Sequence, residues 1–488
     1  MAETRRFAGV ATRTQLAAAN ELSTVLSKQK ARTKYRNPAL EVYDSYYEGR
    51  QYAGMTPWLQ SLSNDNQYIP VRQRAPLINY KLGQIIVMRL AAKLMGSRTR
   101  PEIRVEDDPN TEAFIKAILQ TSRLYSNILE PIRRELAAGS VLVRFAIVNG
   151  QYKIEHFLGK WCYPEFDDIG NLISCRIKYI YEDEQDLDYQ KNPKKKWFQM
   201  DLGQFVDIMY DNPEAKEQSE PVFQEVERVQ HDLGFVQAEW MKPNEKQDTF
   251  DGDSLIEPIM GFIDEFNYSL SQSSNAVSYN QDPQLAIKNM DEEELETLIR
   301  STTKAWNLGK EGEAAFLEAS LEGVKTAMDL RDKMKMGVQD LTRVVMLDPE
   351  KIVGSAQSAK AMEVLHGPMV ELVEELRPQL EKHLQSLLLK LAMATLFMNS
   401  RGEIVPIEIP AGYVPKSASL TFVWPPIFPL TMQDLQQKVS IASSATGANL
   451  ISRETATKWL AKDFGVENID EELAKIAAQP QLNPFGSF

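Results

Sequence analysis

Residues 354–389 read GSAQSAKAMEVLHGPMVELVEELRPQLEKHLQSLLL. A glycine and small polar residues precede a long run in which apolar side chains recur at helical spacing. Prolines interrupt this run at Pro368 and Pro378. A proline inside a helix removes one backbone hydrogen bond and clashes with the preceding turn, so each is predicted to bend the helix without ending it. The alternative is three ordinary helices of a bundle, separated by the prolines.

The composition indicates a globular protein with acidic character. The chain has 488 residues, which leaves room for roughly two to four domains with sizeable cores. Apolar residues make up 43% and charged residues 25%, and the net charge is −13. Because affinity for phosphates comes mainly from Lys and Arg, this balance argues against a protein that coats nucleic acid. It still allows a protein past which DNA slides without being held.

The two cysteines and the apolar segments indicate a reduced, intracellular setting. Cys162 and Cys175 lie in strand-like runs, and no CxxC pair occurs, so neither a disulfide framework nor a zinc site is predicted. The first residues lack the apolar core of a signal peptide. The most apolar helical stretch, 387–397, is too short for a membrane span and contains Lys390. We therefore expect a soluble, unsecreted protein with no cofactor.

The first 245 residues combine helices and strands. Helix-period apolar positions occur at 10–50, 76–97 and 109–138, and Gly96 is a predicted helix stop. Two β-hairpins are predicted from alternating apolar residues around the turns Asn149-Gly150 and Gly170-Asn171. Residues 194–240 indicate further strands. This part is therefore predicted to be α+β.

The remaining residues predict a stalk with a small knob. Residues 251–280 form a long amphipathic run with an Asp or Ser N-cap, and 321–346 form a second one. Between them, 281–318 indicates a strand, a short acidic helix and another strand. At about 1.5 Å per residue each long helix would span about 40 Å. Beyond the proline-interrupted helix, 403–428 is β-like and 431–479 is helical.

Enzymatic motifs are sparse. Asp251 and Asp253 could hold a metal ion in a nuclease, but a third ligand at suitable spacing is missing, and such acids are mostly caps or turns. The four histidines are scattered through unrelated elements, so we expect structural roles for them. The lysines at 194–196 are predicted to lie in a solvated hairpin loop. No enzyme is predicted.

Seven stretches, taken in order, resemble the portal proteins of tailed bacteriophages, of the kind found in long-tailed phages. They are YDSYYEGRQY (43–52), LINYKLGQIIVMRLAAKLMGSR (77–98), AAGSVLVRFAIVNGQYKIEHFLGKWCYPEFDDIGN (137–171), HDLGFVQAEWMKP (231–243), FDGDSLIEPIMGFIDEFNYSLSQSSN (250–275), GSAQSAKAMEVLHGPM (354–369) and LISRETATKWLAKDFGVENIDEELAKI (450–476). The resemblance implies an α+β portal fold with an α/β wing, a two-helix stem, a small α/β clip, a long kinked helix and a helical crown.

The resemblance also implies domain boundaries. They are an N-terminal arm (1–29, partly disordered), wing (30–252), stem (253–280 and 320–346), clip (281–319), tunnel loop (347–357), long kinked helix with the β return to the wing (358–430), crown (431–479) and disordered tail (480–488). The clip insert is short compared with many relatives.

As a function, the resemblance implies a homo-oligomeric ring of about twelve copies at one capsid vertex of the virion, assembled in the host cytoplasm. Double-stranded DNA would pass through its channel during packaging and ejection. The large terminase would dock on the clip, and a head-completion or tail adaptor protein would later take the same surface. The major capsid and scaffolding proteins would be further partners, and no membrane is involved. The alternative is a cellular helical scaffold without a nucleic-acid role.

Three sets of residues are predicted to serve this function. Those of the tunnel loop beside DNA are Lys351, Ile352, Val353, Gly354, Ser355 and Ala356. Candidate phosphate contacts on the second stem helix are Lys325, Arg331, Lys333, Lys335 and Arg343, although Lys333 could instead pair with Asp329. Candidate partner-binding residues of the clip are Asp291, Glu292, Glu293, Glu294 and Lys310.

Overall fold

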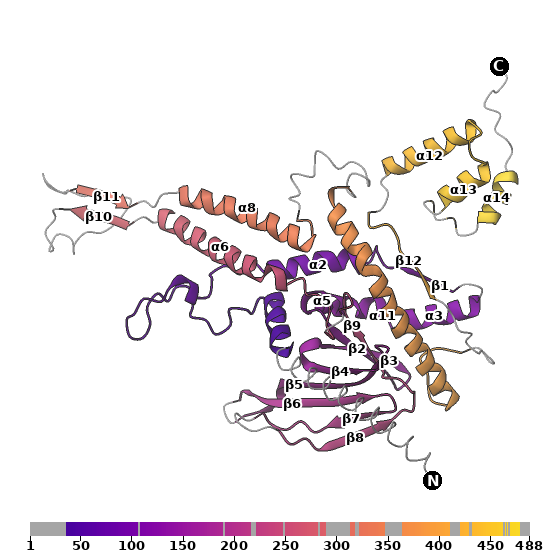
Figure 1. Cartoon of the computed structure of the whole chain (residues 1–488), viewed down its shortest axis with the longest axis horizontal. Coiled ribbons are helices and arrows are strands. Elements are labelled where there is room, and N and C mark those ends of the chain that lie inside the picture. Colours follow the sequence, from indigo (N-terminus) through magenta and orange to yellow (C-terminus); the bar gives the residue numbers. More distant parts are fainter. Residues whose placement is uncertain are drawn as a thin grey trace, which may run out of the picture. The chain divides into compact units, whose positions relative to one another are not determined.

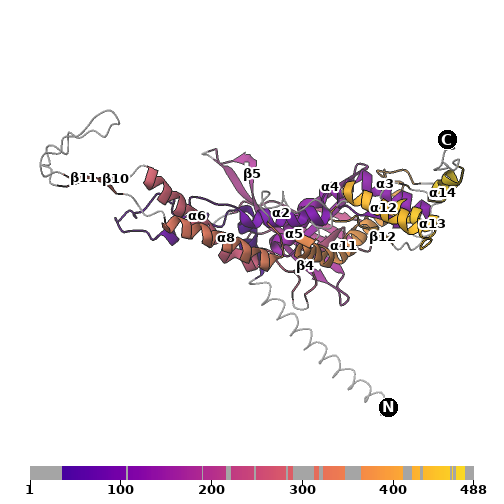
Figure 2. The same ribbon diagram turned by 90° about the horizontal axis from the view of Figure 1, so that it is seen from above.

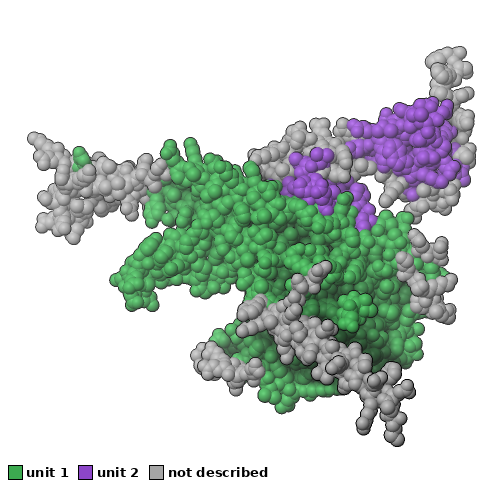
Figure 3. All heavy atoms as spheres, in the orientation of Figure 1, with its two compact units in different colours: residues 1–344, 372–423 green, residues 345–371, 424–488 purple. Residues whose placement is uncertain are grey.

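The computed structural model separates the chain into two compact units. The described residues are 36–105, 108–188, 191–215, 221–246, 249–281, 284–288, 313–317, 322–346, 364–409, 420–428, 432–461, 464, 466 and 469–478. Unit 1 comprises residues 1–344 and 372–423, and unit 2 comprises 345–371 and 424–488. Figure 3 shows unit 1 in green and unit 2 in purple.

Unit 1 begins with short helices. The chain is helical at 36–48, and the elements that follow are η1 (Val71–Gln73), α2 (Leu82–Met95), α3 (Pro109–Thr121), α4 (Leu124–Asn127) and α5 (Leu129–Ala138). Helix α2 ends before Gly96 as predicted, but it starts later than 76 because Lys81 takes a left-handed conformation (φ 51°). The prediction of one helix over 109–138 is wrong. Arg123 is also left-handed (φ 50°) and separates α3 from α4, and a second interruption at Ile128 separates α4 from α5.

Two antiparallel sheets carry most of the strands of unit 1. The first has the order β3-β2-β9 and the second β4-β5-β6-β7-β8. Their bounds are β2 (Val141–Val148), β3 (Gln151–Leu158), β4 (Cys162–Phe166), β5 (Leu172–Leu187), β6 (Pro193–Gly203), β7 (Val206–Tyr210), β8 (Glu225–Gln230) and β9 (Ala238–Met241), with η2 (Gly159–Trp161) between β3 and β4. A third pair joins β1 (Glu102–Val105) to β12 (Leu420–Val423).

Both predicted hairpins are confirmed. Strands β2 and β3 pair over their full length around Asn149 (φ 50°) and Gly150 (φ 71°), the two left-handed residues that a type I′ turn requires. Strands β4 and β5 pair across the turn that contains Gly170 (φ 88°). Cys162 and Cys175 are fully buried free thiols in the core beside these strands.

The proline-interrupted run forms α11 (Gly367–Ser400), a single helix of 34 residues. Pro378 lies inside this helix, as predicted. The prediction of a bend at Pro368 is corrected, because this proline is the second residue of the helix. Backbone N–H groups in a first turn have no partner within the helix, so a proline there costs no hydrogen bond. Leu384, Leu387 and Leu388, in the part of α11 that belongs to unit 1, are fully buried.

Two long helices of unit 1 form a hairpin. They are α6 (Met260–Gln281), which follows η3 (Glu257–Ile259), and α8 (Glu322–Thr342). Between them in the sequence, β10 (Gln284–Lys288) pairs antiparallel with β11 (Glu313–Leu317). Figures 1 and 2 both show α6 and α8 side by side, with the two strands beyond their far ends. The two long helices and the two strands between them occur in the predicted order, and the short acidic helix predicted between the strands lies outside the described residues.

The described residues of unit 2 include three helices near the C-terminus. They are α12 (Met432–Gly447), α13 (Arg453–Ala461) and α14 (Ile469–Ala478). The Ser452 hydroxyl accepts a hydrogen bond from the Thr455 N–H and so caps α13. Across the described part of the chain, none of the helices combines the length and apolar character that crossing a bilayer needs. With these helices and the sheets of unit 1, the chain is α+β, as predicted.

Candidate functional site

The hairpin helices approach closely at a glycine. A Cβ atom added to Gly337 of α8 would lie 2.9 Å from Cε1 of Phe262 on α6. Cβ atoms in proteins essentially never come so close to another atom. Met334 and Val338, one turn apart on α8, are buried at the inner face of the same helix. Helix α8 is therefore held by apolar packing around a glycine notch.

Helix α6 is held at its base by hydrogen bonds from the tyrosine-rich segment 43–52. The Tyr46 hydroxyl donates to Oδ2 of Asp264 (2.6 Å), and the Tyr52 hydroxyl donates to Oδ1 of the same carboxylate (2.8 Å). One acid on α6 thus binds two phenols. Burial, with the bond to Asp264, raises the pKa of Tyr46 and of Tyr52 above the usual value of a phenol.

Asn267 lies one turn further along α6 and is fully buried. Its Oδ1 accepts a hydrogen bond from the Tyr80 N–H (3.0 Å), and its Nδ2 donates to the Tyr52 hydroxyl (3.1 Å). Another turn along, the Ser271 hydroxyl accepts from the Ile78 N–H (3.0 Å). The extended backbone before α2 is therefore bound to α6 by two side chains.

The segment 43–52 also binds the body of unit 1 on its other side. Asp44 is almost fully buried and forms ion pairs with Arg134 of α5 (2.9 Å) and with Lys160 of η2 (2.6 Å). Tyr43 contacts Glu257, and burial together with that hydrogen bond raises the pKa of Tyr43 to about 12. The tyrosine-rich segment thus connects α5 and η2 to the start of α6.

These contacts bring together three of the stretches that carry the resemblance, namely 43–52, 77–98 and 250–275. Sequence reasoning did not single out Asp264, Asn267 or Ser271. A signal was present, because polar residues at spacings of three and four mark one face of a helix. The partners on that face could not be inferred from sequence, since they lie roughly 190 to 220 residues away.

The candidate cations of α8 do not gather on one face. At 3.6 residues per turn, Lys325 and Lys333 lie about 80° apart on the exposed side, and Met334 lies about 180° from Lys325. Lys335 lies on the other flank, about 160° from Lys333. Among the described residues no ion pair joins Lys333 to Asp329, so the predicted alternative pairing is absent there.

The two candidate arginines are engaged by acids. Nη2 of Arg331 lies 3.0 Å from Oδ1 of the adjacent Asp332, and Nη2 of Arg343 lies 2.8 Å from Oε2 of Glu375 on α11. Arg343 was predicted within the second long helix, but α8 ends at Thr342 and Arg343 is left-handed (φ 57°). The prediction of a helix to 346 is therefore wrong by four residues.

Several predicted residues lie outside the described part of the chain. They are Lys351, Ile352, Val353, Gly354, Ser355 and Ala356 of the tunnel loop, and Asp291, Glu292, Glu293, Glu294 and Lys310 of the clip. Their predicted roles stay predictions.

The carboxylates of the proposed nuclease alternative are occupied. Asp251 forms a two-point ion pair with Arg36, with Nε–Oδ2 and Nη2–Oδ1 distances of 2.6 and 2.7 Å, and also accepts from the Ser140 hydroxyl. Asp253 binds Asn244 and Lys246. Within the ranges that the structure describes, no group of three or more potential ligands could hold a metal ion. The geometry at Asp251 is that of a structural ion pair.

Comparisons with known proteins give a family match over most of the chain. Residues 26–482 match the family described as phage portal protein, SPP1 Gp6-like. No curated protein sequence matches the chain.

Two solved structures are similar at low identity. One is titled "Virion of native gene transfer agent (GTA) particle", at 10% identity and a TM-score of 0.43, with 78% of this chain and 89% of that chain covered. The other is titled "Neck of empty GTA particle computed with C6 symmetry", at 10% identity and a TM-score of 0.42, with 78% and 90% covered. At these scores the likeness carries no argument about function.

Proposed function

Because the chain belongs to the SPP1 Gp6-like family of phage portal proteins, we propose that about twelve copies form a ring at one capsid vertex. The family is a structural one whose members form homo-oligomeric rings in particles. Double-stranded DNA passes through the channel of this ring during packaging and ejection. The ring assembles in the host cytoplasm and remains in the virion.

The helical hairpin is the observation that carries this proposal beyond family membership. Helices α6 and α8 have 22 and 21 residues, which correspond to about 32 Å of rise each. The strands β10 and β11 close the hairpin at its far end. We assign the helices to the stem, the strands to the clip, the sheets of unit 1 to the wing and α12–α14 to the crown.

The charge pattern of the hairpin suits a channel for a polyanion. Residues 266–281 of α6 contain no charged side chain, and α8 alternates cations with acids. Such a surface makes weak contacts with phosphates, because each stable phosphate–lysine pair would resist the movement of DNA. Lys325 and Lys333 are the first candidates for these contacts, since both are exposed on the outer side of α8.

The proposal assigns the partners of the ring to the clip and to the surroundings of the ring. The large terminase docks on the clip during packaging, and a head-completion or tail adaptor protein later binds the same surface. The major capsid and scaffolding proteins surround the ring at the vertex. The chain itself supplies no catalysis, which agrees with the ion pairing of Asp251.

Electron microscopy of the purified chain, together with its mass in solution, tests the proposal. Twelve copies of a 55.4 kDa chain weigh about 665 kDa. A ring with an axial hole near this mass supports the portal function, and one additional subunit would still agree with it. A compact monomer, or a rod-shaped dimer without a hole, would overturn the channel and favour a helical scaffold.

A further inference from the structure

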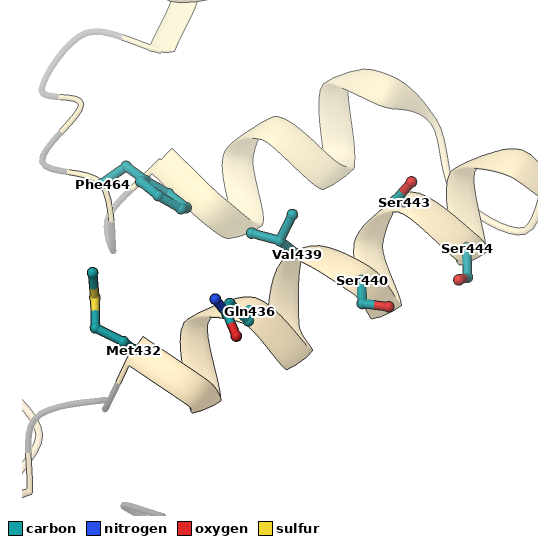
Figure 4. Close-up of a pocket in the computed structure, with 7 residues that line it drawn as sticks. All are labelled: Met432, Gln436, Val439, Ser440, Ser443, Ser444 and Phe464. Atoms are coloured by element: carbon teal, nitrogen blue, oxygen red, sulfur yellow. The ribbon is translucent and has the colours of Figure 1, made fainter.

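Polar groups at the surface and in the core differ in what a missing partner costs. A groove of about 460 Å³ runs along α12, and Figure 4 shows Met432, Val439 and Phe464 in its lining beside Gln436 and three serines. All these residues are exposed, so water can bind the polar ones. In the interior of unit 1 water is excluded, and a polar atom without a partner there lowers the stability of the fold.

Glu135 is an acidic residue in that interior. It lies in the last turn of α5 and is 2% exposed, and its Oε2 has no hydrogen-bond partner among the described residues. A negative charge at this position would also lie at the negative end of the helix dipole. Burial raises the pKa of Glu135 from 4.5 to about 8. At neutral pH the carboxyl group is therefore protonated.

The charged groups of the surrounding elements do not compensate a charge on Glu135. Helix α5 packs against α2, α4 and β2 and contacts the tyrosine-rich segment and residues 251–255. The titratable groups of these elements and of nearby β3 are Glu130, Arg133, Arg134, Arg89, Lys93, Tyr125, Arg144, His156, Asp44, Tyr47, Glu48, Asp251 and Asp253. No ion pair joins any of them to Glu135 within the described ranges, and Arg133 and Arg134 bind Glu130 instead.

The end of α5 binds the chain that leads into α6. Three hydrogen bonds join them: from the Gly252 N–H to the Gly139 oxygen (2.8 Å), from the Leu255 N–H to the Leu136 oxygen (3.0 Å) and from the Ser254 hydroxyl to the Ala137 oxygen (2.5 Å). A Cβ atom at Gly139 would lie 2.6 Å from the Gly252 oxygen, so the two backbones are in close contact. The acceptors all lie within four residues after Glu135.

We propose that Glu135 is a proton-dependent lock on the junction between α5 and the chain that enters α6. The neutral carboxyl group can stay buried, and the last turn of α5 then remains closed on residues 252–255. Loss of the proton would leave a buried charge without a partner, which is relieved when this turn opens and water reaches the carboxylate. The junction is therefore held firmly in acid and loosens as the pH rises. The lock lies within one copy of the chain and does not depend on the ring.

Urea unfolding tests whether the carboxyl group is held neutral. Glu135→Gln keeps the shape of the protonated acid and cannot ionise. The folded parent keeps a proton that its unfolded chain loses above about pH 4.5, so the stability contributed by Glu135 is complete below that pH and is lost as the pH rises through about 8. The unfolding constant of the parent, relative to that of Glu135→Gln, should rise up to about tenfold per pH unit between pH 5 and 8.

The control variant is Glu227→Gln, which removes an acid from the exposed strand β8. Relative to the parent, it should show no such rise. Glu135→Met is a second uncharged variant of similar length, which replaces Glu135→Gln if the amide disturbs the core.

Hydrogen exchange of the amides at 252–255 tests the lock itself. Parent and Glu135→Gln are compared at the same pH, so the intrinsic dependence of exchange on pH cancels. The ratio of their exchange rates should rise at least about tenfold from pH 5 to pH 8. This rise should appear at exchange times too short for strand β6 to exchange, because local opening needs less free energy than global unfolding.

Two results would overturn the inference. A ratio of unfolding constants that stays the same between pH 5 and 8 would show that the folded chain does not hold Glu135 neutral. A ratio that changes without faster exchange at 252–255 would show that the acid titrates without controlling the junction. In either case the ring and its proposed function would be unaffected, since they are tested by the assembly of the parent chain.

Discussion

Helices α6 and α8 lie side by side in one hairpin but are held to the molecule in different ways. Helix α6 is bound by directional hydrogen bonds from Asp264, Asn267 and Ser271, and its second half carries no charge. Helix α8 is held by packing of Met334 and Val338, and its exposed residues mix charged side chains with apolar ones such as Met328. Hydrogen bonds are directional and so fix the rotation and register of a helix, whereas burial of apolar side chains is non-directional. The comparison therefore assigns the fixed orientation of the hairpin to α6.

The largest expected effect is the loss of the carboxylate that binds two phenols. Asp264→Ala should lower the free energy of unfolding by about 2–3 kcal/mol, since hydrogen bonds to charged groups contribute about this much. Urea unfolding of the variant and the parent chain measures the difference. Asp264→Asn, which keeps an acceptor oxygen, should lose about half as much.

The matched control lies on α8. Asp329 is exposed there, so Asp329→Ala should change the unfolding free energy by less than about 0.5 kcal/mol. Equal losses at Asp264 and Asp329 would remove the distinction between the two helices.

Alkaline pH should weaken the hydrogen bonds that Tyr46 and Tyr52 donate to Asp264 of α6. The pKa values of Tyr46 and Tyr52 are raised by folding, so above pH 10 the unfolded chain loses phenolic protons that the folded chain retains. Stability contributed by these groups is thus complete below about pH 10 and is lost as the pH rises further, by up to about 1.4 kcal/mol per group and pH unit.

Other tyrosines of the chain titrate in the same range, so the measurement is a difference between chains. Urea unfolding of the parent and of the Tyr46→Phe, Tyr52→Phe double variant is compared at pH 9 and 11. The parent should lose more stability than the variant over this interval. An identical pH dependence of the two chains would contradict the burial of these phenols against Asp264.

The close packing of the two helices can be tested at glycines of α8. In Gly337→Ala the new methyl group meets the Phe262 ring, so overpacking should exceed the gain in helix propensity and leave a net loss of about 1 kcal/mol. Gly323→Ala on the same helix meets no atom within 4 Å and should be neutral or stabilise by up to about 1 kcal/mol. Thermal unfolding of both variants measures these changes in stability. Stabilisation by both substitutions would indicate that α6 and α8 are further apart than the contact between Gly337 and Phe262 implies.

The smallest effect on stability is expected at the exposed lysines of α8. The double variant Lys325→Gln, Lys333→Gln should unfold within about 0.5 kcal/mol of the parent chain. If these lysines contact phosphates, the retention of packaged DNA should become less dependent on salt. Lys116→Gln on α3 serves as the control. Unchanged salt dependence in intact particles would assign the phosphate contacts to other residues.

Local chemistry explains which parts of the fold were predictable from sequence. The turn at Asn149-Gly150 and the stop at Gly96 follow from residues within a few positions, and both are confirmed. The break at Arg123 was missed because arginine carries no preference for the left-handed conformation it adopts. The early end of α8 at Arg343 was missed for the same reason.

The hydrogen bonds between α6 and the tyrosine-rich segment could not be predicted from sequence. The tyrosine-rich segment was recognised as characteristic, but nothing local identifies Asp264 as the partner of Tyr46 and Tyr52. Sequence patterns give the faces of an element, whereas pairings between distant elements depend on the topology of the whole unit. The exposure of the apolar residues of α12 could not be predicted from sequence either, because burial also depends on contacts between distant elements.

The bonds from Tyr46 to Asp264 and from Arg36 to Asp251 span 218 and 215 residues of sequence. At about 5–20 residues per second, a ribosome needs roughly 10–40 s to add that length of chain. During this interval the first helix has no acceptor for its phenols and no carboxylate for Arg36. We therefore expect the first part of unit 1 to stay partly folded, exposed to chaperones and proteases, until the start of α6 leaves the ribosome.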